Sequence, residues 1–264
     1  MHAPAESNRG PHPSESKSSA PSDQTKERQA NALGGSLLIS ETFSSRQGEG
    51  KLTGTESFFV RTSGCNLRCW FCDTPYASWD AKGKIQSIEE IVNVAQDSGA
   101  RHVVLTGGEP LLPRAAARLS TSLMEAGFHL TIETAGTIDK PIACDLLSLS
   151  PKLESSAPDP HDHPKWHQLH QKRRLSIATM RKLIAAAMDF QLKFVVSGPS
   201  QFDEIRSLSD ELNVDIRDVF IMPQGVTIDH MDAAQEWLRP WCESVGYQYC
   251  DRMQIRWFGN RRGT

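Results

Sequence analysis

Three cysteines lie within eight consecutive positions of this sequence and are the residues best suited to chemistry. Cys65, Cys69 and Cys72 have the spacing C-x3-C-x2-C and directly follow Gly64. Three thiolates on one tight loop can each hold one iron of a cubane [4Fe–4S] cluster, which leaves the fourth iron open to a substrate or cofactor. Structural zinc normally needs four ligands, and no fourth cysteine follows nearby. The spacing favours an iron–sulfur cluster, with a zinc loop or unrelated free thiols as alternatives.

A second segment suited to ligand binding is Thr106–Pro110, which reads TGGEP. It follows a short apolar run, 102–105, that predicts a buried strand. Glycine lets a backbone approach a ligand closely at the carboxyl end of a strand. Alone, the segment could be only a turn. At this distance from the cysteine loop, the two segments together indicate one binding site.

The elements that would position both segments alternate between strands and helices. Ser87 and Glu90 form a capping box that opens one helix. Repeated strand–helix units imply a mostly parallel sheet with helices outside, an α/β fold. We predict strands over 57–61, 102–105, 129–133, 144–149, 192–196, 219–222 and 247–249, and helices over 87–99, 114–126, 175–189, 203–212 and 232–244.

Two polar stretches stand apart from this pattern. Residues 1–34 are rich in Ser, Pro and charged residues and contain few apolar groups to bury, so we expect a disordered tail preceding a domain over 35–264. A polar insertion over 153–174 carries His161, His163, His167 and His170. Four histidines could bind a metal, but no cysteine or carboxylate completes the set at a suitable spacing. We interpret the insertion as a solvated loop broken by prolines.

Composition excludes several classes of protein. The 264 residues carry a net charge of −3, which argues against a nucleic-acid binder that relies on bulk charge. No run of 18 apolar residues predicts a transmembrane helix, and the N-terminus has no apolar signal core. Clustered cysteines without an export signal indicate metal chemistry in a reducing compartment, so we expect a cytoplasmic protein.

The cysteine loop combined with GGEP resembles the radical S-adenosylmethionine (SAM) superfamily. In that superfamily the open iron chelates the amino and carboxylate groups of SAM, and reduction yields a 5′-deoxyadenosyl radical that abstracts hydrogen. The resemblance implies an incomplete (β/α)6-type partial barrel, open on one side. SAM and the cluster would then lie at the carboxyl ends of the strands.

Further motifs resemble one family in that superfamily, the 7-carboxy-7-deazaguanine synthases. This family is a radical SAM lyase of queuosine and 7-deazapurine biosynthesis. It converts 6-carboxy-5,6,7,8-tetrahydropterin to 7-carboxy-7-deazaguanine with loss of ammonia. The shared motifs are QGEG at 47–50, Arg61, C-D-T at 72–74, S-P-K at 150–152, M-P-Q-G at 222–225 and the tail WFGNRRG at 257–263. At 133–136 the chain reads E-T-A-G, with Ala135 where the family has Asn.

The resemblance assigns a role to each matching position. It implies a [4Fe–4S] cluster, SAM, Mg²⁺, a small pterin substrate, a flavodoxin- or ferredoxin-like reductant and a homodimer. It implies no nucleic-acid or membrane partner. The cluster would be held by Cys65, Cys69 and Cys72, and Mg²⁺ would be bound by Thr74. The pterin would be surrounded by Arg46, Gln47, Gly48, Arg61 and Thr106. The residues that would contact SAM or the cluster are Phe71, Asp73, Gly108, Glu109, Glu133, Ser150, Pro151, Lys152, Met222, Pro223, Gln224 and Gly225.

Each motif also has a purely structural interpretation. QGEG could be a glycine-rich turn, and Arg61 could pair with a surface carboxylate. Asp73 and Thr74 could cap the next segment, and S-P-K could be an ordinary strand exit. Two other functions also remain: a different radical SAM enzyme, such as a glycyl-radical activase, and a non-enzymatic iron–sulfur or zinc sensor.

Overall fold

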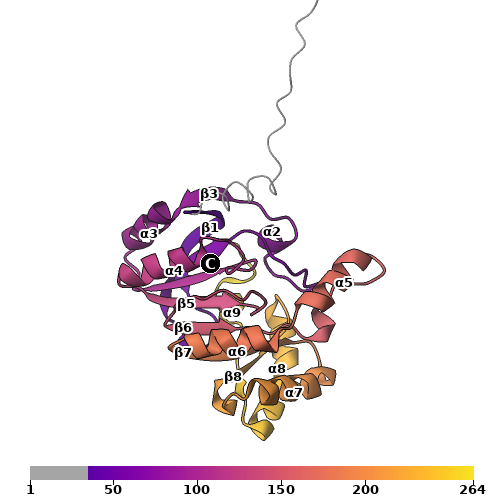
Figure 1. The fold of residues 1–264 in the computed structure, drawn as a ribbon. Coiled ribbons are helices and arrows are strands. Elements are labelled where there is room, and N and C mark those ends of the chain that lie inside the picture. Colours follow the sequence, from indigo (N-terminus) through magenta and orange to yellow (C-terminus); the bar gives the residue numbers. More distant parts are fainter. Residues whose placement is uncertain (1–34) are drawn as a thin grey trace, which may run out of the picture.

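Seven strands run parallel in one curved nine-stranded sheet, in the order β2-β4-β5-β6-β7-β8-β9 (Figure 1). The computed structural model describes residues 35–264, so the predicted tail over 1–34 lies outside the described residues. The six longer strands match the predicted set. Their bounds are β2 (Glu56–Thr62), β4 (His102–Gly107), β5 (His129–Thr134), β6 (Leu146–Leu149), β7 (Asp189–Val196) and β8 (Val219–Pro223), followed by the short β9 (Gln248–Tyr249).

Two antiparallel strands extend the sheet at one edge. β1 (Ser36–Arg46) pairs with β2 on one side and with β3 (Lys84–Ser87) on the other. In this register Glu41 lies opposite Arg61, next to an irregularity between Ile39 and Glu41. The sequence located the start of the domain near Ser36 but predicted neither β1 nor β3 as a strand. The edge brings β1 side chains to the carboxyl end of β2.

Helices connect the parallel strands. The predicted capping box is confirmed, since Ser87 accepts from the Glu90 amide and the Glu90 side chain accepts from the Ser87 amide. The helix predicted to end at Asp189 stops at Ala186, and Asp189 instead begins β7. The helices of these connections are α3 (Ile88–Asp97), α4 (Ala116–Glu125), α6 (Ile177–Ala186), α7 (Phe202–Leu212) and α8 (Ile228–Val245); the short turns are η1 (Gly50–Leu52), η2 (Glu154–Ser156), η3 (Pro199–Gln201) and η4 (Ile216–Asp218).

The core lies between the sheet and these helices. Val60, Leu105, Ile132, Leu149 and Phe194 are fully buried on successive parallel strands. Apolar runs that are buried on both faces are typical of parallel sheets covered by helices. Burying a side chain of this size contributes about 1.5–3 kcal/mol to stability. The carboxyl ends of the strands are thereby held at one edge, where ligands bind in folds of this type.

The insertion over 153–174 is not the open loop that the sequence suggested. It contains α5 (Pro164–Arg173), which projects from the rest of the molecule (Figure 1). His170 within it is completely buried. Pro164 occupies the first turn, where its missing N–H costs nothing, so proline starts this helix instead of breaking the segment.

Two short helices, α2 (Pro75–Ser78) and α9 (Met253–Phe258), lie outside the repeating strand–helix pattern. Among residues 35–264, no helix combines the length and apolar character needed to cross a membrane.

Candidate active site

A cavity of about 490 Å³ opens at the carboxyl ends of the parallel strands. Most of the residues that the sequence singled out line it. They are Arg46, Gln47, Gly48, Arg61, Cys65, Cys69, Phe71, Cys72, Asp73, Thr74, Thr106, Gly108, Glu133, Ser150, Lys152 and Met222. Glu109, Pro151, Pro223, Gln224 and Gly225 lie outside this lining.

The cysteine loop is folded against the GGEP segment. Gly64, at φ +106°, donates its amide to the Ala77 carbonyl at 2.8 Å, and its own carbonyl accepts from the Glu109 amide at 2.9 Å. A Cβ on Gly108 would meet the Gly64 carbonyl oxygen at 2.2 Å and the Ala77 oxygen at 2.6 Å. Glycine at 108 is therefore required by the close approach of the cysteine loop.

The three thiols of this loop line the same cavity, and they fit a cubane cluster better than a single ion. No three cysteine, histidine or acidic side chains in the described part of the chain converge as ligands of one metal ion. In a cubane each thiolate binds a different iron, so convergence on one point is not needed. Burial raises the pKa of Cys65 to about 12 and that of Cys69 to about 11. Metal binding would have to displace those protons.

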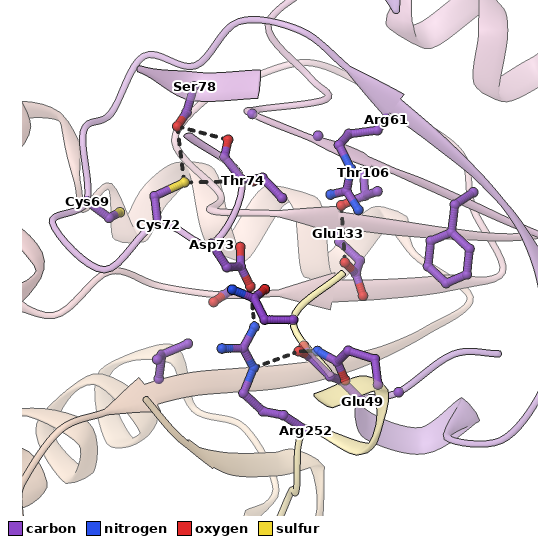
Figure 2. A pocket seen from close by; sticks show the side chains of 18 of the residues that line it. Glu49, Arg61, Cys69, Cys72, Asp73, Thr74, Ser78, Thr106, Glu133 and Arg252 are labelled. Atoms are coloured by element: carbon purple, nitrogen blue, oxygen red, sulfur yellow. Dashed lines mark hydrogen bonds and ion pairs between the residues drawn. The ribbon is translucent and has the colours of Figure 1, made fainter. Parts of the chain in front are cut away.

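The Cys72 thiol contacts two hydroxyls, as Figure 2 shows. Ser78 Oγ lies 3.1 Å and Thr74 Oγ1 lies 3.7 Å from the sulfur. Thr74 precedes α2, but its side chain makes no capping hydrogen bond to that helix. The capping role considered for Thr74 is therefore absent, and its hydroxyl faces the cavity.

Glu109 of the GGEP segment connects the loop after β4 to the end of β5 by hydrogen bonds outside the cavity lining. Its carboxylate is completely buried and accepts from the Thr134 hydroxyl at 2.6 Å and from the Ala135 and Leu111 amides at 3.0 and 3.1 Å. Burial raises the pKa of this carboxyl, against the opposing effect of these hydrogen bonds. These contacts join the loop after β4 to the end of β5.

Glu133, at the end of β5, presents a carboxylate to the cavity. It accepts from Gln47 Nε2 at 3.1 Å and from Thr106 Oγ1 at 3.2 Å. Both donors were predicted to surround the pterin, so Glu133 links the predicted substrate loop to the strand that carries Thr106. Figure 2 shows the contact between Glu133 and Thr106.

Ser150 and Lys152 form a polar pair beyond the end of β6. Lys152 Nζ donates to Ser150 Oγ at 2.7 Å, and both side chains line the cavity. Pro151 between them lies outside the lining. The S-P-K motif thus places one cation and one hydroxyl on the same side of the cavity as the cysteine loop's Cys69, whose thiol Lys152 influences electrostatically.

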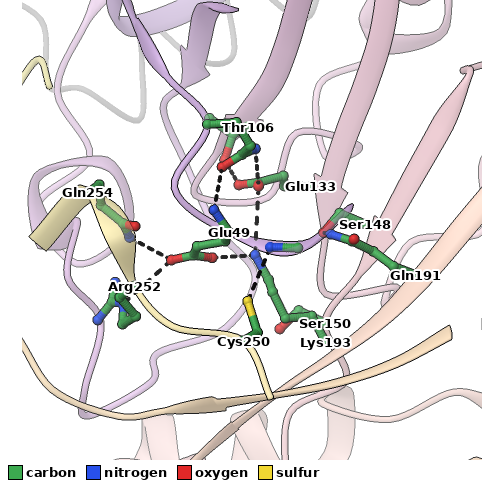
Figure 3. Close-up of polar contacts among 12 residues, drawn as sticks. Glu49, Thr106, Glu133, Ser148, Ser150, Gln191, Lys193, Cys250, Arg252 and Gln254 are labelled. Atoms are coloured by element: carbon green, nitrogen blue, oxygen red, sulfur yellow. Dashed lines mark hydrogen bonds and ion pairs between the residues drawn. The ribbon is translucent and has the colours of Figure 1, made fainter. Parts of the chain in front are cut away.

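A buried charge network lies beside these residues, and the sequence did not predict Lys193, Arg252 and Gln254 as part of the site (Figure 3). Glu49 pairs with Lys193 of β7 and with Arg252 at 3.4 Å, and it accepts from Gln254 Nε2 at 2.6 Å. Burial would raise the pKa of Glu49, but Lys193 and Arg252 outweigh it and lower the pKa. Lys193 also lies 3.7 Å from Glu133.

Arg252 extends that network to the cysteine loop. It forms an ion pair with Asp73 and donates to the Gly225 carbonyl at 2.6 Å. Gly225 of the M-P-Q-G motif therefore holds Arg252. A glycine is also required at position 48, because a Cβ there would lie 2.7 Å from the Gln254 amide nitrogen. The sequence pointed to Glu49, within the QGEG motif, and to Lys193, a polar residue inside the apolar β7 run, but not to Arg252 or Gln254.

The insertion packs on the outer side of the cysteine loop. The Arg68 amide donates to His170 Nδ1 at 3.1 Å, and the Arg68 guanidinium lies 4.1 Å from the centre of the Trp166 ring. Trp70, half exposed, donates to the Ser155 carbonyl at 2.9 Å. α5 therefore supports the loop that carries the three thiols.

The match to the family profile described as Radical SAM superfamily covers residues 59–198, which span the cysteine loop, GGEP and the strands through β7. The chain belongs to the radical SAM superfamily. A protein of Rhodopirellula baltica named 7-carboxy-7-deazaguanine synthase is 58% identical over 89% of this chain and 91% of its own length. One of the same name from Halobacterium salinarum is 45% identical over 89% and 96%.

Solved structures of radical SAM proteins share the fold. The crystal structure of QueE from Escherichia coli has a TM-score of 0.58 at 23% identity and covers 86% of this chain and 97% of that one. Streptococcus suis SuiB bound to its precursor peptide SuiA has a TM-score of 0.52 at 13% identity, over 76% and 54%. The predicted radical SAM α/β architecture is confirmed, with the extra edge strands β1 and β3 added.

Proposed function

We propose that this protein converts 6-carboxy-5,6,7,8-tetrahydropterin to 7-carboxy-7-deazaguanine and ammonia, as a step toward queuosine and related 7-deazapurines. The observation that carries the proposal is convergence. Gln47, Arg61, Thr74 and Thr106 come from separate segments, yet they line one cavity with the three thiols. The 58% identical relative bears the name of this activity. Substrate and product differ by one ammonia, so the reaction consumes no net oxidant.

The chain would contribute binding and orientation. Cys65, Cys69 and Cys72 would hold the cluster, and the cluster with SAM would supply one-electron radical chemistry when bound. Gly108, Ser150 and Lys152 would grip SAM on that side of the cavity.

The opposite side would hold the pterin. A guanidinium can bind a carboxylate through two parallel hydrogen bonds, which suits Arg61 to the substrate carboxylate. Arg46, Gln47, Gly48 and Thr106 would surround the ring, and Thr74 would give one oxygen to Mg²⁺, a hard cation that takes oxygen ligands.

The partners follow from the same proposal. A flavodoxin- or ferredoxin-like protein would deliver the electron, and the enzyme would work as a cytoplasmic homodimer without nucleic-acid or membrane contacts. The net charge of −3 supports the lack of a nucleic-acid role.

The decisive experiment is anaerobic incubation of the reconstituted protein with SAM, reductant, Mg²⁺ and the carboxypterin, read by mass spectrometry. We expect a product lighter than the substrate by one ammonia. Cys69→Ala should abolish cluster content and product, whereas Cys144→Ala, at a buried core position, should retain both. SAM cleavage without carboxypterin turnover would indicate a different radical SAM enzyme, and no SAM cleavage would indicate a sensor.

A further inference from the structure

Glu41 is the anchor of Arg61, the residue proposed to bind the substrate carboxylate. The two lie opposite each other on β1 and β2, and Arg61 Nε donates to Glu41 Oε1 at 2.8 Å. Only 16% of the Arg61 side chain and 12% of the Glu41 side chain are exposed. A buried, charge-assisted hydrogen bond of this kind fixes the orientation of the guanidinium.

Anchoring through Nε leaves the terminal amino groups of Arg61 available. Neither of them hydrogen-bonds to any residue between 35 and 264, while Arg61 lines the cavity. The guanidinium carbon also lies 5.6 Å from the centre of the Phe43 ring, which limits movement on that side. The guanidinium of Arg61 is therefore held through Nε, while its terminal amino groups are free to bind a carboxylate.

The same Glu41 carboxylate also holds the C-terminal tail, residues 259–264, which lines the cavity. Arg262 Nε donates to Glu41 Oε2 at 2.7 Å, and its guanidinium carbon lies 4.2 Å from the centre of the Tyr76 ring. The Tyr76 hydroxyl donates to Glu41 Oε1 at 2.8 Å. One carboxylate thus joins β2, α2 and the tail at the cavity.

The cluster of Glu41, Arg61 and Arg262 is not electrically neutral by itself. Two guanidinium groups, Arg61 and Arg262, share one carboxylate, so the group carries a net charge of +1. Burial acts to raise the pKa of Glu41, but hydrogen bonds from Arg262, Tyr76 and Arg61 lower it, which keeps Glu41 ionised at neutral pH. A ligand carboxylate bound by Arg61 would bring the net charge to zero.

We infer that Glu41 is a positioning residue that presents Arg61 to the substrate carboxylate and holds the C-terminal tail against the cavity through Arg262. This inference rests on the proposed function. Through Arg61, Glu41 would give the site its selectivity for a pterin that carries a carboxylate. Substrate binding and the position of the C-terminal tail would then both depend on the Glu41 side chain.

The first test compares binding of 7-carboxy-7-deazaguanine and 7-deazaguanine, which differ only in the carboxylate, to reconstituted protein with SAM. Wild type should prefer the carboxylated ligand. Glu41→Gln keeps the shape but removes the charge, and should reduce that preference roughly 10- to 100-fold, the range for losing a charged hydrogen bond. Glu89→Gln, at an exposed position in the first turn of α3, is the matched control. An unchanged preference in Glu41→Gln would overturn the inference.

The second test addresses the tail. Arg262→Met should raise KM for the carboxypterin with less change in kcat and should speed removal of C-terminal residues by carboxypeptidase. The double variant with Glu41→Gln and Arg262→Met should lose C-terminal residues to carboxypeptidase no faster than Glu41→Gln alone, because both substitutions remove the same contact. Additive loss of protection, or lower cluster content with an unchanged KM, would overturn the inference. Failure of the proposed function is distinct, since wild type itself would then form no product.

Discussion

Lys193 is a buried cation whose nearest carboxylates are Glu49 and Glu133. Burial lowers the pKa of a lysine, but Glu133 and Glu49 outweigh that effect and raise the pKa of Lys193. Partners of this kind must be kept together, because a buried charge without its counterion costs several kcal/mol. The residues beside the cavity therefore depend on one another for their charge states.

Lys193→Met should lower the free energy of unfolding by about 3–5 kcal/mol, since it leaves Glu49 and Glu133 short of one buried positive charge. Lys182→Met, at an ion pair whose lysine side chain is 66% exposed, should change it by about 1 kcal/mol or less. Urea denaturation under anaerobic conditions measures both. Equal losses in the two variants would contradict the role of Lys193.

The effect of acid on the stability of Lys193→Met follows from the pKa of Glu49. Its pKa is lowered in the folded state, so its contribution to stability is present above the unfolded pKa of about 4.3 and is lost as pH falls below it. Without Lys193 the pKa of Glu49 should rise. Lys193→Met should therefore lose less stability than wild type as the pH falls below about 4.3, as measured by the same denaturation at several pH values.

Thr74→Ala should reduce turnover and its stimulation by Mg²⁺, while cluster content and uncoupled SAM cleavage stay close to those of wild type. The hydroxyl faces the cavity and makes no capping bond, so its removal takes away the oxygen proposed to bind Mg²⁺ but no helix contact. Thr74→Ser keeps the oxygen and should retain most activity. Product formation measured against Mg²⁺ concentration tests this, and equal stimulation of wild type and Thr74→Ala would exclude the metal role.

At the scale of elements, α5 and the cysteine loop form one packed unit. Ser156 Oγ donates to the Leu153 carbonyl at 2.6 Å, so it accepts from His170 Nε2 at 2.8 Å. His170 Nδ1 in turn accepts from the Arg68 amide. These roles require a neutral imidazole with its proton on Nε2, because a second proton on Nδ1 would face the Arg68 N–H.

Acid should therefore loosen this unit. Burial, with Lys152 and Arg174, lowers the pKa of His170 to about 4, below the unfolded value of about 6.5. The unfolded chain binds more protons between these values, so stability falls as pH drops from 6.5 toward 4, by about 2 kcal/mol at pH 5.

Replacing His170 by Gln should remove that part of the pH dependence, whatever it does to stability at neutral pH. The measurement is the difference in free energy of unfolding between pH 7.5 and pH 5. The matched control is His161→Gln, at a side chain that is 93% exposed, and it should keep the wild-type difference. A His170→Gln variant with the wild-type difference would contradict the neutral buried histidine.

At the scale of the whole molecule, the curved sheet and the C-terminal tail together make the cavity. The strands supply Arg61, Thr106 and Glu133 from their carboxyl ends, and the tail over 259–264 lies against them. The described chain begins at the antiparallel edge, where β1 pairs with both β2 and β3.

Removing residues 1–30 should leave activity and melting temperature nearly unchanged. Within residues 1–34, Met1 and Leu33 are the only large apolar residues, so little apolar surface is available to bury on the domain. Thermal unfolding and turnover of the shortened protein test this. A fall of many degrees in melting temperature would show that the segment contributes to the fold.

The sequence by itself determined what depends on local spacing. Cysteine spacing, the GGEP segment and apolar runs of strand length are properties of a few consecutive residues, and they predicted the cysteine loop, the positions of the parallel strands and many of the residues that line the cavity. The capping box at Ser87 was predictable for the same reason, since both partners lie within one helical turn.

Only the tertiary structure decided which distant side chains meet. Gln254 contacts Glu49 across 205 positions and Arg252 contacts Asp73 across 179, and no local pattern indicates such pairs. The polar composition of 153–174 hid α5, because that helix is stabilised by packing on the cysteine loop and not by an apolar face of its own. Glu41 likewise gained its partners only when β1, α2 and the tail were brought together at one edge of the sheet.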